Sequence, residues 1–367
     1  MSDESVRAHG IGLPLLTTEP LQYGQPDLRI DAGSRRVRVV ALGGGTGLSV
    51  LLGGLRTALF PSRGRRTAGR DRERLTAIVT TADDGGSSGR LRRAYGMVPP
   101  GDIRKCLVAL SDGDPTLAAI FNFRFNGHQV QDVGGHSLGN LILTALSQIE
   151  NDDFLGALDR ANHILGARGR VLPSSLDDVR LVAEFTDGSR AEGESRIASA
   201  RRLIRRVRLV PETAHALPQA LRAIAAADLI VIGPGSLYTS LIPVLLLRDL
   251  ADAIARARAR VVLVMNLMTE PGETDGAGAR EHLLAIRRHA PRVRIHDVFV
   301  NSAPIPSRLA ERYAADGALP ITPDVDALQA LGCRVVEADL LAPGYLVRHD
   351  PNKLARAVLH LAQEVRS

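Results

Sequence analysis

Tryptophan is absent from this chain of 367 residues, and aromatic residues make up only 3% of it. Proteins that bind single-stranded nucleic acid stack the bases on aromatic side chains beside a basic groove. The two densest basic stretches, SRGRRTAGRDRER at 62–74 and RIASARRLIRRVR at 196–208, contain no aromatic residue. We therefore expect no nucleic-acid binding, although the formal charge is +6.

Cysteine and long apolar runs are also scarce. Cys106 lies in a helical pattern and Cys333 precedes a strand pattern, so we expect two buried free thiols rather than a disulfide. The longest apolar runs have the length of strands, far below the roughly 18 residues that a membrane span needs. The first 35 residues lack the order of a signal peptide. We expect a cytoplasmic protein with a flexible tail at 1–35 and no membrane span.

From residue 36 onward, apolar strand-like runs alternate with helical ones. This alternation predicts an α/β fold, a Rossmann-like and mostly parallel sheet flanked by helices. The expected strands are 37–42, 75–81, 228–233, 260–266 and 294–301, and residues 102–166 are expected to be nearly all helical. The period changes at about 170–210, where an Asp187–Gly188 turn predicts a small β insertion. We expect one domain at 36–367 that carries this insertion.

A glycine-rich bend, VVALGGGTGLSVLLGGLR at 39–56, joins the first strand to a helix. Such a bend directs backbone N–H groups and the positive end of the helix dipole at its guest, which is commonly a phosphate. The G-x-G-x-x-G spacing is not met, and no Gly-Lys-Ser/Thr follows, so a P-loop is excluded. The alternative is a tight turn without a ligand. The expected phosphate-facing residues are Gly43, Gly44, Gly45, Thr46 and Gly47.

A second bend of this kind, GPGSLYTSLIPVLL at 233–246, follows the strand expected at 228–233. Gly233 and Gly235 free the backbone, and Ser236 is expected to cap the helix. Tyr238 and the two hydroxyl residues after it are expected to point polar groups outward. Two such bends in one sheet predict a site for a diphosphate or for two ligands.

A third polar segment, TADDGGSSGRLR at 81–92, follows the second strand. Asp83 and Asp84 precede a run of glycines with Ser87 and Ser88, which can present N–H groups and hydroxyls to an anion. Such a carboxylate pair suits a hydrated Mg²⁺ that bridges to phosphate, or a grip on a sugar hydroxyl. The alternative is that Asp83 caps a turn and Asp84 is solvated.

Further pocket residues are expected on three segments. Asp102 of PPGDIRKCLVALS is expected to be an N-cap, with Arg104 or Lys105 paired with a phosphate or with the preceding acids. In GGHSLGNLIL a hydrolytic Ser–His reading is weak, because the Ser137 context departs from G-x-S-x-G. The pocket residues expected on these segments and on NLMTEPGETDG are Asp102, Arg104, His136, Asn140, Asn266 and Thr269.

These motifs, in this order and with the late YLVRHDPNKLA, resemble the YvcK family of gluconeogenesis factors over about residues 36–365. The family is a relative of 2-phospho-L-lactate transferase, CofD. The resemblance implies a cytoplasmic protein that binds UDP-glucose or UDP-N-acetylglucosamine and supports cell shape and peptidoglycan synthesis during gluconeogenic growth. It also implies that Arg348 contacts the nucleotide sugar and that Asp83 and Asp84 correspond to an acidic pair that in the transferase faces the acceptor.

The residues themselves offer no convincing nucleophile, general base or metal cage, which fits a sensor better than an enzyme. We expect no catalytic residue, no certain cofactor, a UDP-sugar as ligand, Mg²⁺ as an optional ion and a homo-oligomer. One alternative is a transferase in which Asp83 and Asp84 hold Mg²⁺ and the acceptor. Another is an NAD(P) binder, but positions 63–70 offer only arginines as charged residues where NAD needs an acid.

Overall fold

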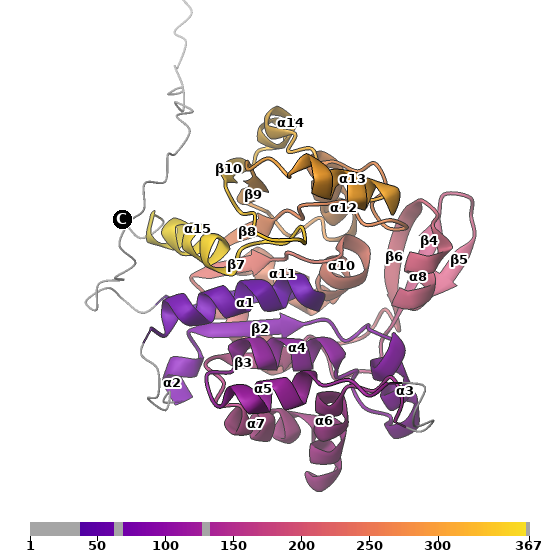
Figure 1. The fold of residues 1–367 in the computed structure, drawn as a ribbon, viewed down its shortest axis with the longest axis vertical. Helices are drawn as coiled ribbons and strands as arrows, with labels where there is room; N and C mark the ends of the chain where they lie inside the picture. Colours follow the sequence, from indigo (N-terminus) through magenta and orange to yellow (C-terminus); the bar gives the residue numbers. More distant parts are fainter. Residues whose placement is uncertain (1–36, 62–68, 127–132, 365–367) are drawn as a thin grey trace, which may run out of the picture.

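The computed structural model describes residues 37–61, 69–126 and 133–364 (Figure 1). The expected tail at 1–35 and residues 62–68 of the first basic stretch lie outside these ranges. The main sheet has the strand order β10 (Arg334–Ala338), β9 (Asp297–Asn301), β8 (Arg260–Val264), β7 (Leu229–Ile232), β1 (Val39–Gly43), β2 (Leu75–Val79) and β3 (Arg170–Pro173). All neighbouring pairs are parallel, which confirms the expected α/β fold.

The two outer strands, β3 and β10, were not among the five strands expected in this sheet, although β10 is the strand pattern expected after Cys333. The five expected strands are present, with ends that differ by a few residues. β3 is only four residues long, and β10 alternates exposed and buried residues, so neither has the continuous apolar run of a central strand. The prediction that the insertion begins at about 170 is therefore wrong, because β3 belongs to the main sheet.

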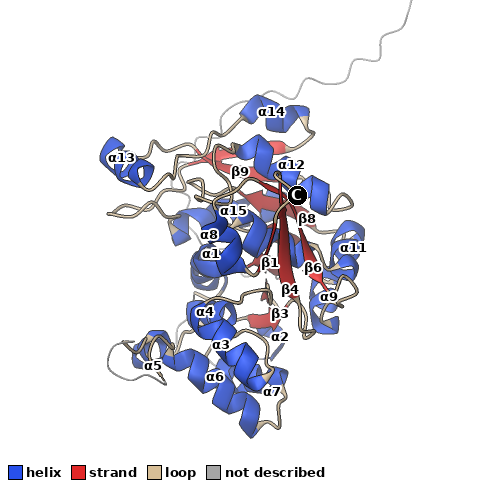
Figure 2. Cartoon of the chain, turned by 90° about the vertical axis from the view of Figure 1, so that its right-hand side faces the viewer, coloured by secondary structure: helices blue, strands red, loops and turns tan. Residues whose placement is uncertain are grey.

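Helices cover both faces of the main sheet (Figure 2). Val39 and Ala41 of β1 point into one core, and Val40 and Leu42 point into the other, as the two-residue period of a strand requires. The first core contains residues of α1 (Gly45–Leu59), α4 (Gly101–Leu110), α5 (Pro115–Asn122), α6 (Leu138–Ile149), α7 (Phe154–Ile164) and α15 (Pro351–Glu364). The second contains residues of α9 (Pro218–Ala225), α10 (Ile242–Leu245), α11 (Arg248–Arg256), α12 (Ala279–His289) and α14 (Val325–Ala330). In the described ranges no helix is both long and apolar enough to cross a membrane.

The insertion is a small antiparallel sheet at one side of the molecule (Figure 1). Its order is β5 (Arg190–Glu192), β4 (Arg180–Phe185) and β6 (Ile204–Val210), and α8 (Glu194–Ala200) lies between β5 and β6 in the chain. The expected Asp187–Gly188 turn connects β4 to β5, with Gly188 at φ +83°. Leu181, Ile197 and Leu209 belong to the same apolar core as one face of the main sheet. The insertion is thus packed against the body of the protein.

The remaining described helices are α2 (Gly69–Arg72), α3 (Gly86–Tyr95) and α13 (Ser307–Ala315).

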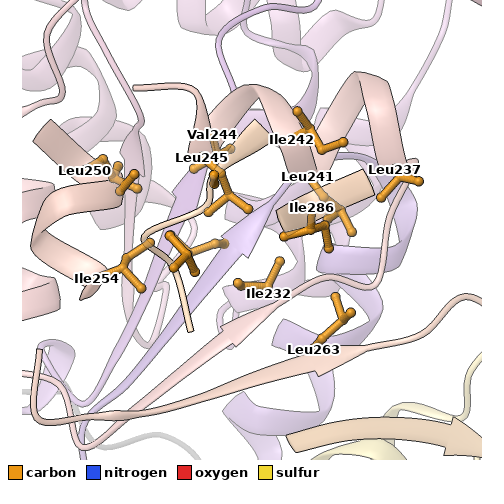
Figure 3. Packing of buried hydrophobic residues seen from close by; sticks show 14 of the residues in the cluster. Ile232, Leu237, Leu241, Ile242, Val244, Leu245, Leu250, Ile254, Leu263 and Ile286 are labelled. Atoms are coloured by element: carbon orange, nitrogen blue, oxygen red, sulfur yellow. The ribbon is translucent and has the colours of Figure 1, made fainter. Parts of the chain in front are cut away.

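A π-helical segment, η1 (Leu237–Leu241), is anchored by the core beneath it (Figure 3). Leu237 and Leu241 belong to one apolar cluster with Ile232 at the end of β7 and Leu263 of β8. These four side chains are at most 4% exposed. The packing therefore fixes η1, and the glycine bend before it, against the sheet.

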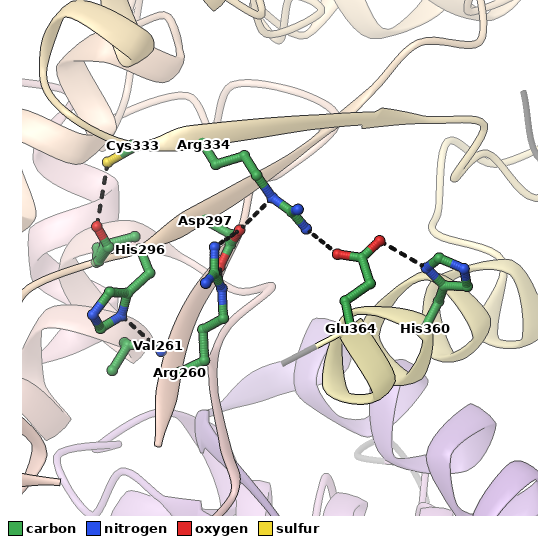
Figure 4. A network of polar contacts seen from close by, with 9 residues as sticks. Arg260, Val261, His296, Asp297, Cys333, Arg334, His360 and Glu364 are labelled. Atoms are coloured by element: carbon green, nitrogen blue, oxygen red, sulfur yellow. Dashed lines mark hydrogen bonds and ion pairs between the residues drawn. The ribbon is translucent and has the colours of Figure 1, made fainter. Parts of the chain in front are cut away.

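A buried carboxylate ties together the amino ends of three strands (Figure 4). Asp297, the first residue of β9, is 0% exposed and accepts hydrogen bonds from Arg260 of β8 and Arg334 of β10. Arg334 also donates to Glu364 of α15 at 2.7 Å. This network lies at the edge of the sheet opposite the glycine bends, so we regard it as structural.

The two cysteines are buried and free, as expected. Cys106 lies in α4, and Cys333 immediately precedes β10. Burial raises the pKa of both thiols, so neither is a reactive thiolate near neutral pH.

Candidate functional site

The two glycine bends meet at the point where the strand order reverses. From β1 the chain proceeds outward through β2 and β3, and it then returns to the other side of β1 with β7. The N–H of Gly233 donates to the carbonyl of Leu42 at 2.9 Å, so the bends leave adjacent strands side by side. A Cβ atom at Gly47 would lie 2.5 Å from the carbonyl oxygen of Pro234, which requires glycine there. Parallel sheets bind ligands at such a switch point.

The start of α1 already contacts a carboxylate. The N–H of Gly45 donates to Oδ2 of Asp102 at 2.7 Å, and a Cβ atom at Gly44 would lie 2.6 Å from the same oxygen. Oδ1 of Asp102 accepts a hydrogen bond from Lys105 at 2.9 Å. The prediction that Asp102 caps its own helix is wrong: Pro100 is the N-cap of α4, and Asp102 caps α1 instead.

The start of η1 also contacts a carboxylate from another segment. Glu273 accepts a hydrogen bond from the N–H of Tyr238 at 3.2 Å and one from the Thr239 hydroxyl at 2.8 Å. Ser236 is the N-cap residue, but its side chain bonds with Glu270 and not with the helix. Tyr238, Thr239 and Ser240 are only 8%, 1% and 3% exposed, so the prediction that they point outward is wrong. The Tyr238 N–H and the Thr239 hydroxyl face the internal acid Glu273, and the Ser240 hydroxyl lies beside the first glycine bend.

Asn266 joins the end of β8 to the second bend. Its Oδ1 accepts a hydrogen bond from the N–H of Gly235 at 3.1 Å, and its Nδ2 donates to the carbonyl of Gly235 at 3.0 Å. Thr269 is buried and exchanges hydrogen bonds with the backbone of Leu319, at 2.7 and 2.8 Å. The structure therefore places Asn266 at the switch point, whereas Thr269 anchors the loop beyond it.

The two acids that follow β2 face different neighbours. Asp83 accepts a hydrogen bond from the N–H of Gly85 at 2.8 Å and bonds with the Ser88 hydroxyl. Asp84 packs so closely on Gly193 of the insertion that a Cβ atom there would lie 1.7 Å from its Oδ2. It is partly exposed and faces the insertion.

Asp83 alone of this pair lies with the acids of the switch point. Burial raises the pKa of Asp83, and the charge of Asp102 raises it further. Within the described residues no three His, Cys, Asp or Glu side chains are arranged to hold a metal. A Mg²⁺ ion is commonly bound by one or two carboxylates together with ligand phosphates. Asp83 and Asp102 fit that partial role, and Asp84 does not.

Two acids of the site have strongly raised pKa values. Burial, followed by the charges of Asp83, Asp102 and Glu273, raises the pKa of Glu194 to about 9. Burial and the nearby Glu270 raise the pKa of Glu273 to about 7. Glu194 was missed in the sequence, because it is brought to the site by the packing of the insertion and no local motif marks it. The site is an acidic region in which Lys105 supplies a positive charge.

A chain of buried polar residues supports one wall of this region. Nδ1 of His136 lies 2.9 Å from the Ser87 hydroxyl, which accepts a hydrogen bond from Asn140 at 3.0 Å. Arg104 donates to Oδ1 of Asn140 at 3.0 Å and to that of Asn122 at 2.6 Å. Arg104 is 5% exposed and bonds with none of the preceding acids, and Lys105, the other residue proposed for this role, pairs with Asp102. The role of Arg104 is to hold α4 to α5 and α6.

The segment after β10 folds back over the ends of β8 and β9. Val347 packs with Leu267 and Met268, and its N–H donates to the Tyr313 hydroxyl of α13 at 3.2 Å. His349 is buried and hydrogen-bonded to the backbone of Met265. Arg348 lies between these two anchored residues and is exposed. Its side chain makes no hydrogen bond or ion pair with the described part of the chain, so a free guanidinium is held at the same edge as the glycine bends.

Known proteins are similar to this chain in sequence and in fold. The sequence profile of the family described as 2-phospho-L-lactate transferase CofD matches residues 39–341. The gluconeogenesis factor of Bacillus subtilis is 41% identical over 331 residues, which cover 90% of this chain and 99% of that protein. The gluconeogenesis factor of Halalkalibacterium halodurans is 43% identical over 327 residues, which cover 89% and 96%. The crystal structure of a UPF0052 family member from Bacillus halodurans is similar with a TM-score of 0.81 and 42% identity, covering 89% of this chain and 100% of that one.

Proposed function

Because this chain belongs to the CofD family and to its gluconeogenesis-factor relatives, we propose that it is a cytoplasmic regulatory protein that binds a nucleotide-activated sugar. The ligand class is a UDP-sugar such as UDP-glucose or UDP-N-acetylglucosamine. The proposed role is to adjust the supply of peptidoglycan precursors, and thereby cell shape, during growth on gluconeogenic carbon sources.

The observation that carries this proposal is the contact between the two glycine bends. A diphosphate needs several N–H donors within a few ångströms. The second bend closes the site on one side, but its Gly233, Gly235 and Tyr238 N–H groups are bonded within the protein, so the donors are sought at the start of α1. Asp102 takes only the N–H of Gly45. The N–H groups of Thr46 and Gly47 lie in the same first turn, where no intrahelical carbonyl reaches them. These two groups are the proposed phosphate donors of α1.

A diphosphate at this site also needs a positively charged side chain close to it. The acids near the switch point repel a diphosphate, so binding needs a compensating positive charge. Lys105 is paired with Asp102, whereas Arg348 is exposed and free of described partners. We assign to Arg348 the contact with the diphosphate or with the uridine. The nearly neutral Glu194, whose pKa is raised to about 9, adds no charge near pH 7 and can donate a hydrogen bond to a sugar hydroxyl.

A transferase remains the second candidate, and the placement of Asp83 beside Asp102 favours it. When a nucleoside diphosphate is bound, these carboxylates can share a Mg²⁺ ion with its phosphates. The ion would then neutralise charge on the leaving phosphate. The acceptor would lie between Asp83 and the insertion, where Glu194 is placed by α8.

Calorimetric titration separates these functions. The ligands are UDP-N-acetylglucosamine, GDP and NADP⁺, each with and without Mg²⁺, and the ligand is recovered and analysed afterwards. Metal-independent binding of the UDP-sugar, recovered intact, supports the regulatory protein. Consumption of the ligand, or binding of GDP only with Mg²⁺, would identify a transferase instead. Preferential binding of NADP⁺ would contradict both.

Two arginine variants test the site itself. Arg348→Ala is expected to weaken UDP-sugar binding by about tenfold, the usual loss for one charge-assisted hydrogen bond. Arg222→Ala is the control, because this exposed arginine lies in the last turn of α9, which precedes β7 and so approaches the opposite edge of the sheet. Equal affinity of both variants and the wild type would remove the segment after β10 from the site. Light scattering of the same samples measures whether the protein is the homo-oligomer we propose.

A further inference from the structure

A pocket lies between the insertion and the body of the protein. Its volume is about 510 Å³, within the range of small-molecule sites. β6 contributes one wall, and the ends of α10 and α12 contribute the others. The lining residues are Arg205, Arg206, Val207, Leu246, Arg288 and His289.

The pocket carries an excess of positive charge. Arg205 and Arg206 both donate to the one carboxylate of Glu184, at 2.9 and 3.1 Å. Arg288 donates only weakly, at 3.4 Å, to the backbone carbonyl of Arg205. Two of the three guanidinium groups share the carboxylate of Glu184 and the third has no carboxylate partner in the described part of the chain, so the three arginines exceed this one acid by two positive charges. Each arginine has five N–H donors, and these bonds use a minority of them.

His289 forms an uncharged floor for these arginines. Its Nε2 accepts a hydrogen bond from the N–H of Val207 at 2.9 Å, and its Nδ1 lies 2.8 Å from the carbonyl oxygen of Ala285. Burial lowers the pKa of His289, and the charges of Arg288 and Arg206 lower it further. With both ring nitrogens engaged, His289 offers its ring face and not a donor. Together with Val207 and Leu246 it makes the inner wall largely apolar.

We infer that this pocket binds a small ligand that carries two or more phosphate groups. The arginine rim supplies planar donor pairs that match phosphate oxygens, and the apolar wall can receive the organic part of a phosphate ester. An excess of two charges favours a multiply charged phosphate over a single carboxylate. Arg205 and Arg206 belong to the basic stretch at 196–208, no residue of which is assigned to phosphate binding at the glycine bends.

This site is separate from the switch point but is joined to it by one residue. The ring of Tyr238 lies edge-on to His289, with 6.0 Å between ring centres. Its backbone N–H donates to Glu273 at 3.2 Å, which is part of the acidic region. A ligand in this pocket therefore touches His289, whose ring in turn contacts Tyr238 of η1.

Calorimetric titration with tripolyphosphate tests the inference. The wild type is compared with the double variant Arg206→Gln/Arg288→Gln. The matched control is Arg202→Gln/Arg292→Gln, which removes two exposed arginines that form ion pairs elsewhere. We expect the pocket variant to bind at least tenfold more weakly than the wild type and the control.

Three outcomes would overturn the inference. Equal weakening in the control would mean that tripolyphosphate responds to net charge alone. Unchanged affinity in the pocket variant would place the phosphate at another site, such as the glycine bends. Binding of a single-stranded oligonucleotide through these arginines, without tripolyphosphate binding, would identify a nucleic-acid surface. Thermal unfolding of both variants, expected to match the wild type, shows that a loss of binding is not a loss of fold.

Discussion

Oδ2 of Asp102 accepts a hydrogen bond from the backbone N–H of Gly45, with 2.7 Å between the two atoms. Helix α1 therefore begins on a negative charge that α4 supplies. The same carboxylate is bonded to Lys105 at 2.9 Å. A phosphate at the first glycine bend consequently has this carboxylate as its neighbour.

Replacing Asp102 with Asn tests this arrangement. The variant keeps the shape of the side chain but removes one negative charge beside the bend, so we expect UDP-N-acetylglucosamine to bind about three- to tenfold more tightly. The free energy of unfolding is expected to fall by about 1–2 kcal/mol, because a charged hydrogen-bond acceptor is lost. Asp114→Asn is the control, since Asp114 caps α5 at an exposed position. Weaker binding by a folded Asp102→Asn protein would instead make Asp102 a direct ligand contact.

Stability should depend on pH through Glu194. Its ordinary pKa of 4.5 applies to the unfolded chain, and its pKa in the folded protein is about 9. Between these values the folded state binds more protons than the unfolded state, so the free energy of unfolding falls as pH rises. Glu194→Gln cannot ionise and should lose this part of the pH dependence.

Denaturant unfolding at pH 5 and pH 8 measures the effect. We expect Glu194→Gln to match the wild type at pH 5 and to exceed it by roughly 1–3 kcal/mol at pH 8. Glu192→Gln is the control, because Glu192 lies two residues away and is 47% exposed. An identical difference at both pH values would mean that Glu194 is ionised in the folded protein like an ordinary glutamate.

Features of the site that are formed by residues close in sequence could be predicted, whereas contacts between segments distant in sequence could not. The glycine bends could be located because a bend between an apolar strand and a helix is encoded locally, at Gly43 to Gly47 and at Gly233 to Ser236. The parallel order of the sheet then implies that such bends lie at one edge. The carboxylates that cap them, Asp102 and Glu273, come from segments that are distant in sequence, and no local pattern shows where these side chains point.

The incorrect predictions have the same origin. Asp102 was predicted to cap the helix in which it lies, since local capping is the usual role of an aspartate after Pro-Gly. Arg104 or Lys105 was predicted to pair with a phosphate or with Asp83 or Asp84, but Arg104 is buried against Asn140 and Asn122, and Lys105 pairs with Asp102. β3 was assigned to the insertion because four residues of an edge strand carry too little pattern to show their partner.

The buried carboxylate at the amino edge is expected to dominate local stability. The substitution Asp297→Asn removes the negative charge with which Arg260 and Arg334 both pair. We therefore expect the free energy of unfolding to fall by about 3 kcal/mol. Glu192→Gln is again the control, because its ion pair with Arg180 is about half exposed and should contribute less than about 1 kcal/mol. UDP-sugar affinity should not change, since the network lies at the opposite edge. A loss below 1 kcal/mol for Asp297→Asn would show that the two arginines are satisfied by solvent.

Two neighbouring glycines of α1 should respond in opposite directions to the same substitution. A Cβ atom at Gly54 would lie 1.8 Å from the carbonyl oxygen of Pro351, at the start of α15, whereas a Cβ atom at Gly53 would meet no atom within 4 Å. Gly54→Ala must therefore push α15 away from α1, and we expect the free energy of unfolding to fall by about 2–4 kcal/mol. Gly53→Ala relieves the entropic cost of glycine inside a helix and should raise it by about 0.5–1 kcal/mol. Denaturant unfolding of both variants measures the difference, and equal values would mean that α15 does not pack on α1 as closely as the structure places it. Because α15 follows directly on the segment that carries Arg348, we also expect Gly54→Ala, but not Gly53→Ala, to weaken UDP-sugar binding.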